Sequence, residues 1–154
     1  MDVSKLTIKH LSKLIASREI SSVELVETTI KKIEKLNPKL NAFITIIDQS
    51  ARIEAERADS LIKQGKYLGP LHGIPISLKD LIYIKGVRST SGSKILADFV
   101  PDYDSTITRN LREAGAVIIG TNNLHEFASG ITGINPHYGS SKNPWDPTRM
   151  SGGS

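Results

Sequence analysis

The sequence predicts an α/β fold in which amphipathic helices alternate with short apolar strands. Apolar residues recur at helical spacing in three segments, residues 8–15, 23–33 and 51–62. Two short runs that read as strands lie between or after these segments, at residues 43–47 and 74–79. A fourth helical pattern around Ile107 leads into the wholly apolar run 116–120. A helix followed by a buried strand is typical of an α/β unit with a parallel strand pair.

The predicted helices have recognisable signals at their ends. Thr7 is a candidate N-cap of the first helix, and Ser21 with Glu24 forms a capping box for the second. Asn37–Pro38 is expected to end the second helix, because proline cannot continue a helix and restricts the residue before it. For the later helices the expected caps are Asp48, Asp104 and Ser105, and the expected ends are Gly65 and Gly115.

Proline and glycine also predict the character of the strands and loops. Pro75 lies near the start of the strand 74–79, which favours an edge position or the point where the chain enters a strand. From Thr121 to Ser154 the chain is rich in glycine, serine, asparagine and proline, so an irregular segment is expected. Within it, the only tryptophan lies between two prolines in the segment 143–147, which predicts a rigid, packed turn.

Length and composition indicate one soluble globular domain. The chain has 154 residues, of which 38% are hydrophobic and 23% charged, enough for a single domain with a core. No apolar run approaches the ~20 residues of a membrane-spanning helix. Residues 1–10 lack the basic-then-apolar plan of a secretory signal, so a cytoplasmic location without a membrane partner is expected. The absence of cysteine excludes disulfides, thiolate metal sites and cysteine nucleophiles.

The net charge of +4 comes from basic residues spread along the chain, with acidic residues between them. Lys31, Lys32, Arg52 and Arg57 fall in helical patterns that also contain glutamates, so they are interpreted as solvated helix faces. A docking surface for RNA is the alternative interpretation of the same residues.

Lys79 is the first candidate for chemistry. On an alternating strand it shares a face with Ser77, opposite the apolar Ile76 and Leu78. A surface lysine that pairs with Asp80, or is solvated at the strand end, would account for it without a function. Alternatively, apolar surroundings would desolvate the amine and favour its neutral form, which could act as a general base.

The second candidate is the closing segment, Ser151–Ser154. Glycine next to serine lets backbone amides approach a substrate oxygen closely, although flexible linkers have the same composition. Phosphate-binding loops, the dinucleotide fingerprint and the nucleophile elbow are absent from the sequence. The histidines, which form no close cluster and are interpreted as structural, are His10, His72, His125 and His137. Neither a metal nor a cofactor is therefore expected.

Four segments resemble, in order, the motifs of the amidase signature family. Residues 69–80 resemble its lysine-bearing motif and residues 115–128 its next block, while 143–146 and 151–154 resemble the start of its glycine–serine signature. The two N-terminal helices also fit the family's usual opening. The resemblance implies an α/β fold with a mixed central sheet flanked by helices. Residues 1–154 would form the N-terminal portion of a single amidase-signature domain.

The resemblance also implies a Ser-cisSer-Lys mechanism. Lys79 matches the catalytic lysine, and Ser154 matches the serine that follows a non-proline cis peptide bond. Neutral Lys79 would take a proton, through Ser154, from a nucleophilic serine that attacks the amide carbonyl. In the family, that nucleophile, the oxyanion hole and the residues that select substrates lie downstream of the relay serine. This sequence is therefore expected to be a fragment that is inactive alone, and its substrate-binding residues stay unknown.

Three functions remain open. The first is a stand-alone amidase that acts on non-peptide carbon–nitrogen bonds of small-molecule amides, with the C-terminal part of the same protein as its complement. The second is the A subunit of a tRNA-dependent amidotransferase, which releases ammonia from glutamine for partner subunits. His125, where the A subunit more often has aspartate, and the segment 134–139 favour the first. The third is a non-catalytic truncated module, which the missing nucleophile favours for this chain by itself.

Overall fold

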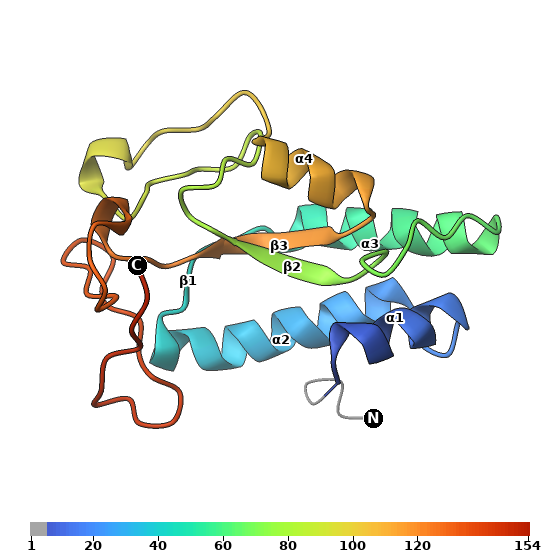
Figure 1. Cartoon of the computed structure of the whole chain (residues 1–154), viewed down its shortest axis with the longest axis horizontal. Coiled ribbons are helices and arrows are strands. Elements are labelled where there is room, and N and C mark those ends of the chain that lie inside the picture. Colours follow the sequence, from blue (N-terminus) through green and yellow to red (C-terminus); the bar gives the residue numbers. More distant parts are fainter. Residues whose placement is uncertain (1–5) are drawn as a thin grey trace. The chain divides into compact units, whose positions relative to one another are not determined.

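The computed structural model describes residues 6–154, in which four α-helices and three strands are connected by loops (Figure 1). The elements in chain order are α1 (Ile8–Ala16), α2 (Ser22–Leu40), β1 (Phe43–Ile46), α3 (Asp48–Lys63), β2 (Pro75–Lys79), α4 (Thr106–Glu113) and β3 (Val117–Asn122). The predicted α/β class is confirmed. Residues 1–5 lie outside the described residues. They form half of the segment 1–10, on which the expectation of no secretory signal rests.

The chain forms two compact units, each assembled from three separate segments. Unit 1 contains the described residues up to Ile33, together with Ile47–Ile76 and Arg109–Ile119. Unit 2 contains Glu34–Ile46, Ser77–Thr108 and Gly120–Ser154. Each unit is described below by itself, and the single amidase-signature domain stays a prediction.

An aliphatic cluster forms the centre of unit 1. Its buried members are Leu11, Ile15, Ile20, Leu25, Ile62 and Ile74. Burying such a side chain contributes about 1.5–3 kcal/mol each, so this cluster is a principal source of stability for the unit. On α3, Ala51, Ala55 and Ala58 are buried along one face, as their spacing predicted. Figure 1 shows α1 beside the first turns of α2.

Most helix signals read from the sequence are confirmed. Thr7 Oγ1 accepts a hydrogen bond from the His10 N–H. The capping box is complete, since the Ser21 N–H donates to Glu24 and the Glu24 N–H donates to the Ser21 hydroxyl. The other confirmed signals are the cap Ser105, whose hydroxyl accepts from Thr108 N–H, and the terminal glycines Gly65 and Gly115, both with positive φ.

The start of α3 differs from the prediction. Ile47 occupies the N-cap position without a side-chain bond, and Asp48 is the first helical residue. The Asp48 carboxylate instead accepts a 2.6 Å hydrogen bond from Arg52, one turn further along the helix. The bond to the Arg52 guanidinium holds the pKa of Asp48 below its ordinary value. Asp48 is therefore paired with a charged side chain of its own helix instead of capping it.

The end of α2 also differs, because the helix continues through Pro38 to Leu40. Asn37 accounts for this extension: its side chain accepts from the Phe43 N–H at 2.9 Å and donates to the Phe43 carbonyl at 3.2 Å. Asn41 then adopts φ +49° and donates its N–H to the Asn37 carbonyl at 2.7 Å. The proline removes one N–H near the helix end, and the helix closes on the left-handed conformation of Asn41.

The three strands form one mixed sheet in the order β1–β3–β2. β1 and β3 are antiparallel, and within unit 2 Thr45 lies opposite Thr121 and Ile46 opposite Gly120. A Cβ atom on Gly120 would lie 2.4 Å from the Thr45 carbonyl oxygen, so this pairing requires glycine.

β2 and β3 run in the same direction. The Val117 N–H donates to the Ile74 carbonyl at one end, and the Asp80 N–H donates to the Asn122 carbonyl at the other. β2 is an edge strand, which confirms the position predicted from Pro75. Residues 117–121 of β3 are buried, as expected for the central strand of a covered sheet.

Beyond β3 the chain is largely irregular, as predicted. It contains one short 3₁₀ turn at Glu126–Ala128 and an isolated bridge between Lys142 and Met150. The turn at residues 143–147 is not packed at its tryptophan as expected, because Trp145 is 94% exposed. The turn is held by its own polar groups: the Asn143 side chain accepts from the Trp145 N–H at 2.9 Å.

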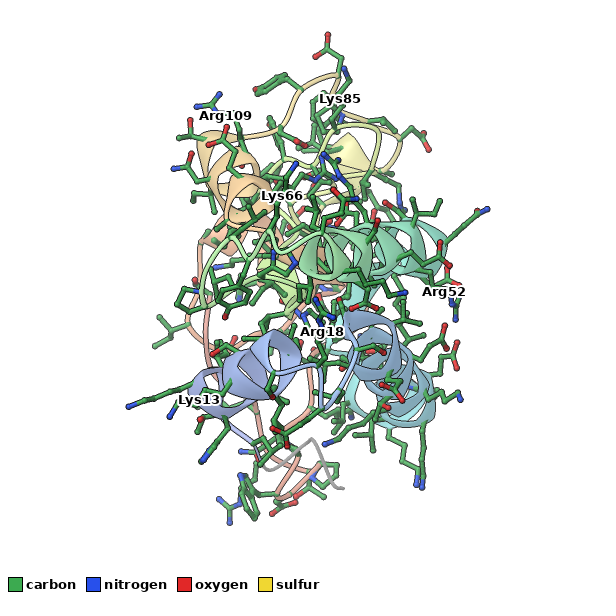
Figure 2. The ribbon with its side chains drawn as sticks, turned by 90° about the vertical axis from the view of Figure 1, so that its right-hand side faces the viewer. Lys13, Arg18, Arg52, Lys66, Lys85 and Arg109 are labelled. Atoms are coloured by element: carbon green, nitrogen blue, oxygen red, sulfur yellow. The ribbon has the colours of Figure 1, made fainter. Side chains whose placement is uncertain are left out.

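The basic residues of unit 1 come from different elements. Figure 2 shows Lys13 on α1, Arg18 in the turn that follows it, and Arg52 on α3. Arg52 is paired with Glu27 at 2.5 Å and with Asp48, whereas Lys31, Lys32 and Arg57 are exposed. This arrangement agrees with solvated helix faces. No helix among residues 6–154 is long and apolar enough to span a membrane.

Candidate active site

Lys79 and Ser154 meet in unit 2. Lys79 is the last residue of β2, and its Nζ donates a 2.5 Å hydrogen bond to the Ser154 hydroxyl, although 75 residues separate the two in the chain. Lys79 is half-buried and Ser154 is exposed. Among the described residues, the Asp80 carboxylate bonds to Thr90 and not to Lys79, and the catalytic role of Lys79 stays a prediction. The structure thus brings together the two residues that the resemblance paired.

Asp80, the next residue, is completely buried. Its Oδ2 accepts two hydrogen bonds from Thr90, one from the N–H at 2.8 Å and one from the hydroxyl at 2.5 Å. Its Oδ1 is buried and has no hydrogen-bond partner among residues 6–154. A buried carboxylate that lacks full pairing is costly, and such groups concentrate at functional sites.

The backbone of Asp80 is held as firmly as its side chain. Its N–H donates to the Asn122 carbonyl of β3 at 3.1 Å. Its carbonyl accepts from the Ser89 hydroxyl at 3.1 Å and from the Ser91 N–H at 2.9 Å. The strand end that carries Lys79 is therefore fixed between β3 and the loop 89–92.

Asn135 ties this loop to the rest of unit 2. Its buried amide nitrogen donates to the Gly92 carbonyl at 2.8 Å and to the Leu124 carbonyl at 2.9 Å. Its oxygen accepts from the N–H groups of His137 and Tyr138. The amide makes four hydrogen bonds, which satisfies its capacity for donors and acceptors. One side chain therefore fixes three loop segments.

Glu126 makes a second polar link between the same loops. Its Oε1 accepts from the Ser93 hydroxyl at 2.6 Å and lies 3.0 Å from His137 Nε2. The Ser93 hydroxyl, followed by the charge of His137 and the His137 hydrogen bond, lowers the pKa of Glu126 below its ordinary value. The carboxylate is thus kept ionised as part of the loop structure.

Three non-glycine residues near this network adopt the left-handed conformation. They are Ser91 (φ +50°), Phe127 (φ +50°) and Ala128 (φ +54°). The Phe127 N–H donates to the Ser91 carbonyl at 2.8 Å, and the Ser91 N–H donates to Asp80. Such conformations cost about 1–3 kcal/mol each and cluster at functional sites. The strained segment is therefore linked through hydrogen bonds to the strand end that carries Lys79.

Two of the histidines, His72 and His125, lie against polar groups of the chain. His72 is completely buried, with Nε2 2.9 Å from the Ala58 carbonyl oxygen and Nδ1 accepting from the Leu68 N–H at 3.3 Å. The His125 ring covers Gly130, and its Nδ1 lies 3.3 Å from Thr132. Among the described residues, no group of three or more His, Cys, Asp or Glu side chains is arranged to hold a metal ion.

The resemblance implied a cis peptide bond before Ser154, and residues 6–154 contain no cis bond. A non-proline cis bond costs ~3–4 kcal/mol and persists only where the surrounding structure imposes it. No described atom lies within 4 Å of where a Cβ atom on Gly152 or Gly153 would be.

Sequence reasoning misses most of the residues around Lys79. From the sequence, Asp80 is only a possible ion-pair partner, and Thr90, Glu126 and Asn135 have no role. The available signal is the run of small polar residues 89–93 between apolar segments. Only the fold shows that this run is buried against Asp80.

The chain is an α/β protein with a mixed sheet, and a hydrogen-bonded lysine–serine pair lies at the end of β2. Comparison with known sequences identifies the family to which it belongs. The chain belongs to the amidase family, whose family model, described as Amidase, matches residues 24–154. It is 44% identical, over 153 residues, to the A subunit of the glutamyl-tRNA(Gln) amidotransferase of Dehalococcoides mccartyi (strain CBDB1). That match covers 99% of this chain and 31% of the relative, so the chain spans about a third of the length of the curated relatives it matches.

Solved structures share the fold. A chain from a vestigial protein complex that reveals the evolutionary origins of an s-triazine catabolic enzyme has a TM-score of 0.94 and 35% identity. That match covers 97% of this chain and 33% of the other. The native peptide amidase from Stenotrophomonas maltophilia has a TM-score of 0.88 and 32% identity, over 96% of this chain and 31% of its own. The predicted amidase fold, present here in its N-terminal part, is confirmed.

Proposed function

We propose that this chain is the lysine-bearing part of an enzyme that hydrolyses non-peptide carbon–nitrogen bonds of amides, with Lys79 as general base and Ser154 as proton relay. The supporting observation is the 2.5 Å hydrogen bond between their side chains in a chain of the amidase family. The two side chains are in direct hydrogen-bond contact, as proton transfer between them requires.

In the proposed reaction, neutral Lys79 accepts the proton of the Ser154 hydroxyl while Ser154 accepts the proton of a nucleophilic serine. The nucleophile forms a bond to the amide carbon, and the relay returns a proton to the nitrogen as the carbon–nitrogen bond breaks. Water then hydrolyses the acyl-enzyme. The nucleophile is expected downstream of Ser154, so we propose that residues 1–154 alone do not turn over an amide.

Two forms of this function differ in the amide that is hydrolysed, which is either a small-molecule amide or glutamine. His125 and the segment 134–139 favour a stand-alone amidase of small molecules. Curated relatives at 44–46% identity are instead named as the A subunit of glutamyl-tRNA(Gln) amidotransferase, which favours glutamine as the amide and a role beside partner subunits. Both forms use the same lysine and serine and share the proposed cytoplasmic location.

Amide hydrolysis by the full-length protein that contains this chain tests the proposal. We expect turnover within a panel of simple amides and glutamine, abolished by Lys79→Ala and strongly reduced by Ser154→Ala. Lys85→Ala, which removes an exposed lysine of unit 2, is the control and should leave the rate unchanged. Retention of most activity by Lys79→Ala would exclude the proposed mechanism. Turnover of glutamine alone, or only with partner subunits and tRNA, would identify the amidotransferase form.

A further inference from the structure

We propose that Asp80 is a positioning residue for Lys79, acting through a carboxylate–Thr90 clamp buried behind the strand end; this inference rests on the proposed function. The clamp comprises the side chain of Asp80, both donors of Thr90 and the loop 89–92. Asp80 directly follows Lys79, the proposed general base, in the chain.

Asp80 and Thr90 form a polar pair in the interior of unit 2. Asp80 and Thr90 are both completely buried. Fully buried positions are more often occupied by apolar residues than by aspartate or threonine. The Oδ1 atom has no donor among residues 6–154. A buried carboxylate that is only half satisfied weakens a fold when compared with a well-packed apolar pair. Stability alone therefore does not account for this residue.

The geometry shows what the clamp holds. The Thr90 hydroxyl donates to Asp80 and itself accepts from the Gly92 N–H at 3.0 Å, so it is fixed in orientation. Together with the Asn122, Ser89 and Ser91 bonds, five hydrogen bonds fix the residue that follows Lys79.

A lysine side chain is long and has several rotatable bonds, so its amine is placed accurately only if the backbone at its base is fixed. The other end of this side chain meets a serine in a glycine-rich segment, where Gly152 and Gly153 have positive φ and open space. Loss of the clamp would therefore shift the amine relative to the Ser154 hydroxyl. A displacement of about 1 Å at a catalytic group can cost roughly 100-fold in rate.

The experiment compares variants of the full-length protein by kcat, KM and melting temperature, with an amide that it turns over. Thr90→Val removes the hydroxyl bond at nearly constant shape, Thr90→Ser retains it, and Asp80→Asn removes the charge. Ser22→Ala is the matched control in unit 1, because its buried hydroxyl donates to the Gly73 carbonyl at 2.8 Å. It removes a comparable buried hydrogen bond far along the chain from Lys79.

We expect Thr90→Val and Asp80→Asn to lower kcat by about 10- to 100-fold with KM nearly unchanged, and Thr90→Ser to restore most of kcat. Ser22→Ala should lower the melting temperature without this loss of kcat. The inference is overturned if Thr90→Val retains kcat within about twofold, or if Ser22→Ala loses as much kcat as Thr90→Val. If Asp80→Asn fails to fold, the comparison of Thr90→Val with Thr90→Ser tests the inference by itself. Activity that survives Lys79→Ala would instead overturn the proposed function, so the two failures are distinguishable.

Discussion

Glu126 illustrates how single polar side chains organise unit 2. It follows β3 by four residues and accepts hydrogen bonds from one loop through Ser93 and from another through His137. Its pKa is lowered chiefly by the Ser93 hydroxyl and then by His137. A carboxyl whose pKa is lowered by folding stabilises the folded state fully above its unfolded pKa, and this contribution shrinks as the pH falls towards the folded pKa.

The effect of pH on stability follows from that shift. The contribution of Glu126 is fully present above its ordinary pKa of 4.5 and is lost as the pH falls through the lower pKa of the folded state. Melting temperatures of the chain and of Glu126→Gln, measured from neutral pH downward, should therefore differ at neutral pH and converge in acid. A difference that stays constant throughout would contradict this role, and Glu113→Gln, which concerns a carboxyl of unit 1, is the control.

Residues could be predicted from the sequence where a motif fixes them and not where burial decides. Lys79 and Ser154 are singled out because both lie in segments that resemble family motifs; the structure places their side chains in hydrogen-bond contact, and their catalytic roles stay a prediction. Asp80 and Thr90 were not assigned a role, because ten residues separate them and sequence alone does not show that both are buried. Trp145 was wrongly expected to be packed, since flanking prolines restrict the backbone without providing neighbours for the ring.

Among the elements, the β1–β3 pair depends on one glycine. A Cβ atom on Gly120 would lie 2.4 Å from the backbone oxygen of Thr45, and backbone atoms cannot move aside as the end of a side chain can. Gly86 also has a positive φ, but no described atom lies within 4 Å of the place that its Cβ atom would take. Comparing alanine substitutions at the two glycines therefore distinguishes the cost of a steric clash from the cost of an unfavourable backbone conformation.

We expect Gly120→Ala to destabilise the chain by about 2 kcal/mol or more beyond Gly86→Ala, because overpacking adds to the cost of backbone strain. Urea denaturation of both variants measures the difference. Equal losses in the two variants would show that the clash at Thr45 is relieved by movement of β1.

The type of each element was predictable from the sequence. The end of α2 was not, because the helix continues past its expected stop and Asn37 bonds to Phe43 across the turn.

At the scale of the whole molecule, the sequence indicated the α/β class and the edge position of β2. The sheet order and the antiparallel pairing of β1 could not be predicted from the residues, because they depend on contacts between segments far apart in the chain. The division into two units was also not foreseen. Each unit combines three segments that local patterns do not connect.

Unit 2 exposes an unusual set of apolar side chains in its last segment. These are Phe127 (48%), Ile131 (82%), Ile134 (53%), Trp145 (94%) and Met150 (62%). Apolar residues that are exposed singly are common on protein surfaces, whereas a contiguous apolar patch is typical of a surface that another polypeptide covers. The remainder of the full-length protein is the expected cover.

Trp145 provides a direct measurement, because it is the only tryptophan of the chain. In the isolated chain, acrylamide should quench its fluorescence as effectively as it quenches the urea-unfolded chain. Weak quenching in the isolated chain would show that the indole is already covered. In the full-length protein, with any other tryptophans replaced by phenylalanine, we expect quenching to decrease as the indole becomes buried.

The interleaving of the two units has a consequence for synthesis on the ribosome. Unit 1 needs the segment Arg109–Ile119, and unit 2 needs Gly120–Ser154, so neither can be completed while only the residues before Arg109 have emerged. At about 5–20 residues per second, the early helices wait several seconds for their partners. During that interval the nascent chain exposes the aliphatic residues of α1 and α2 that pack together with Ile62 and Ile74 in the completed unit.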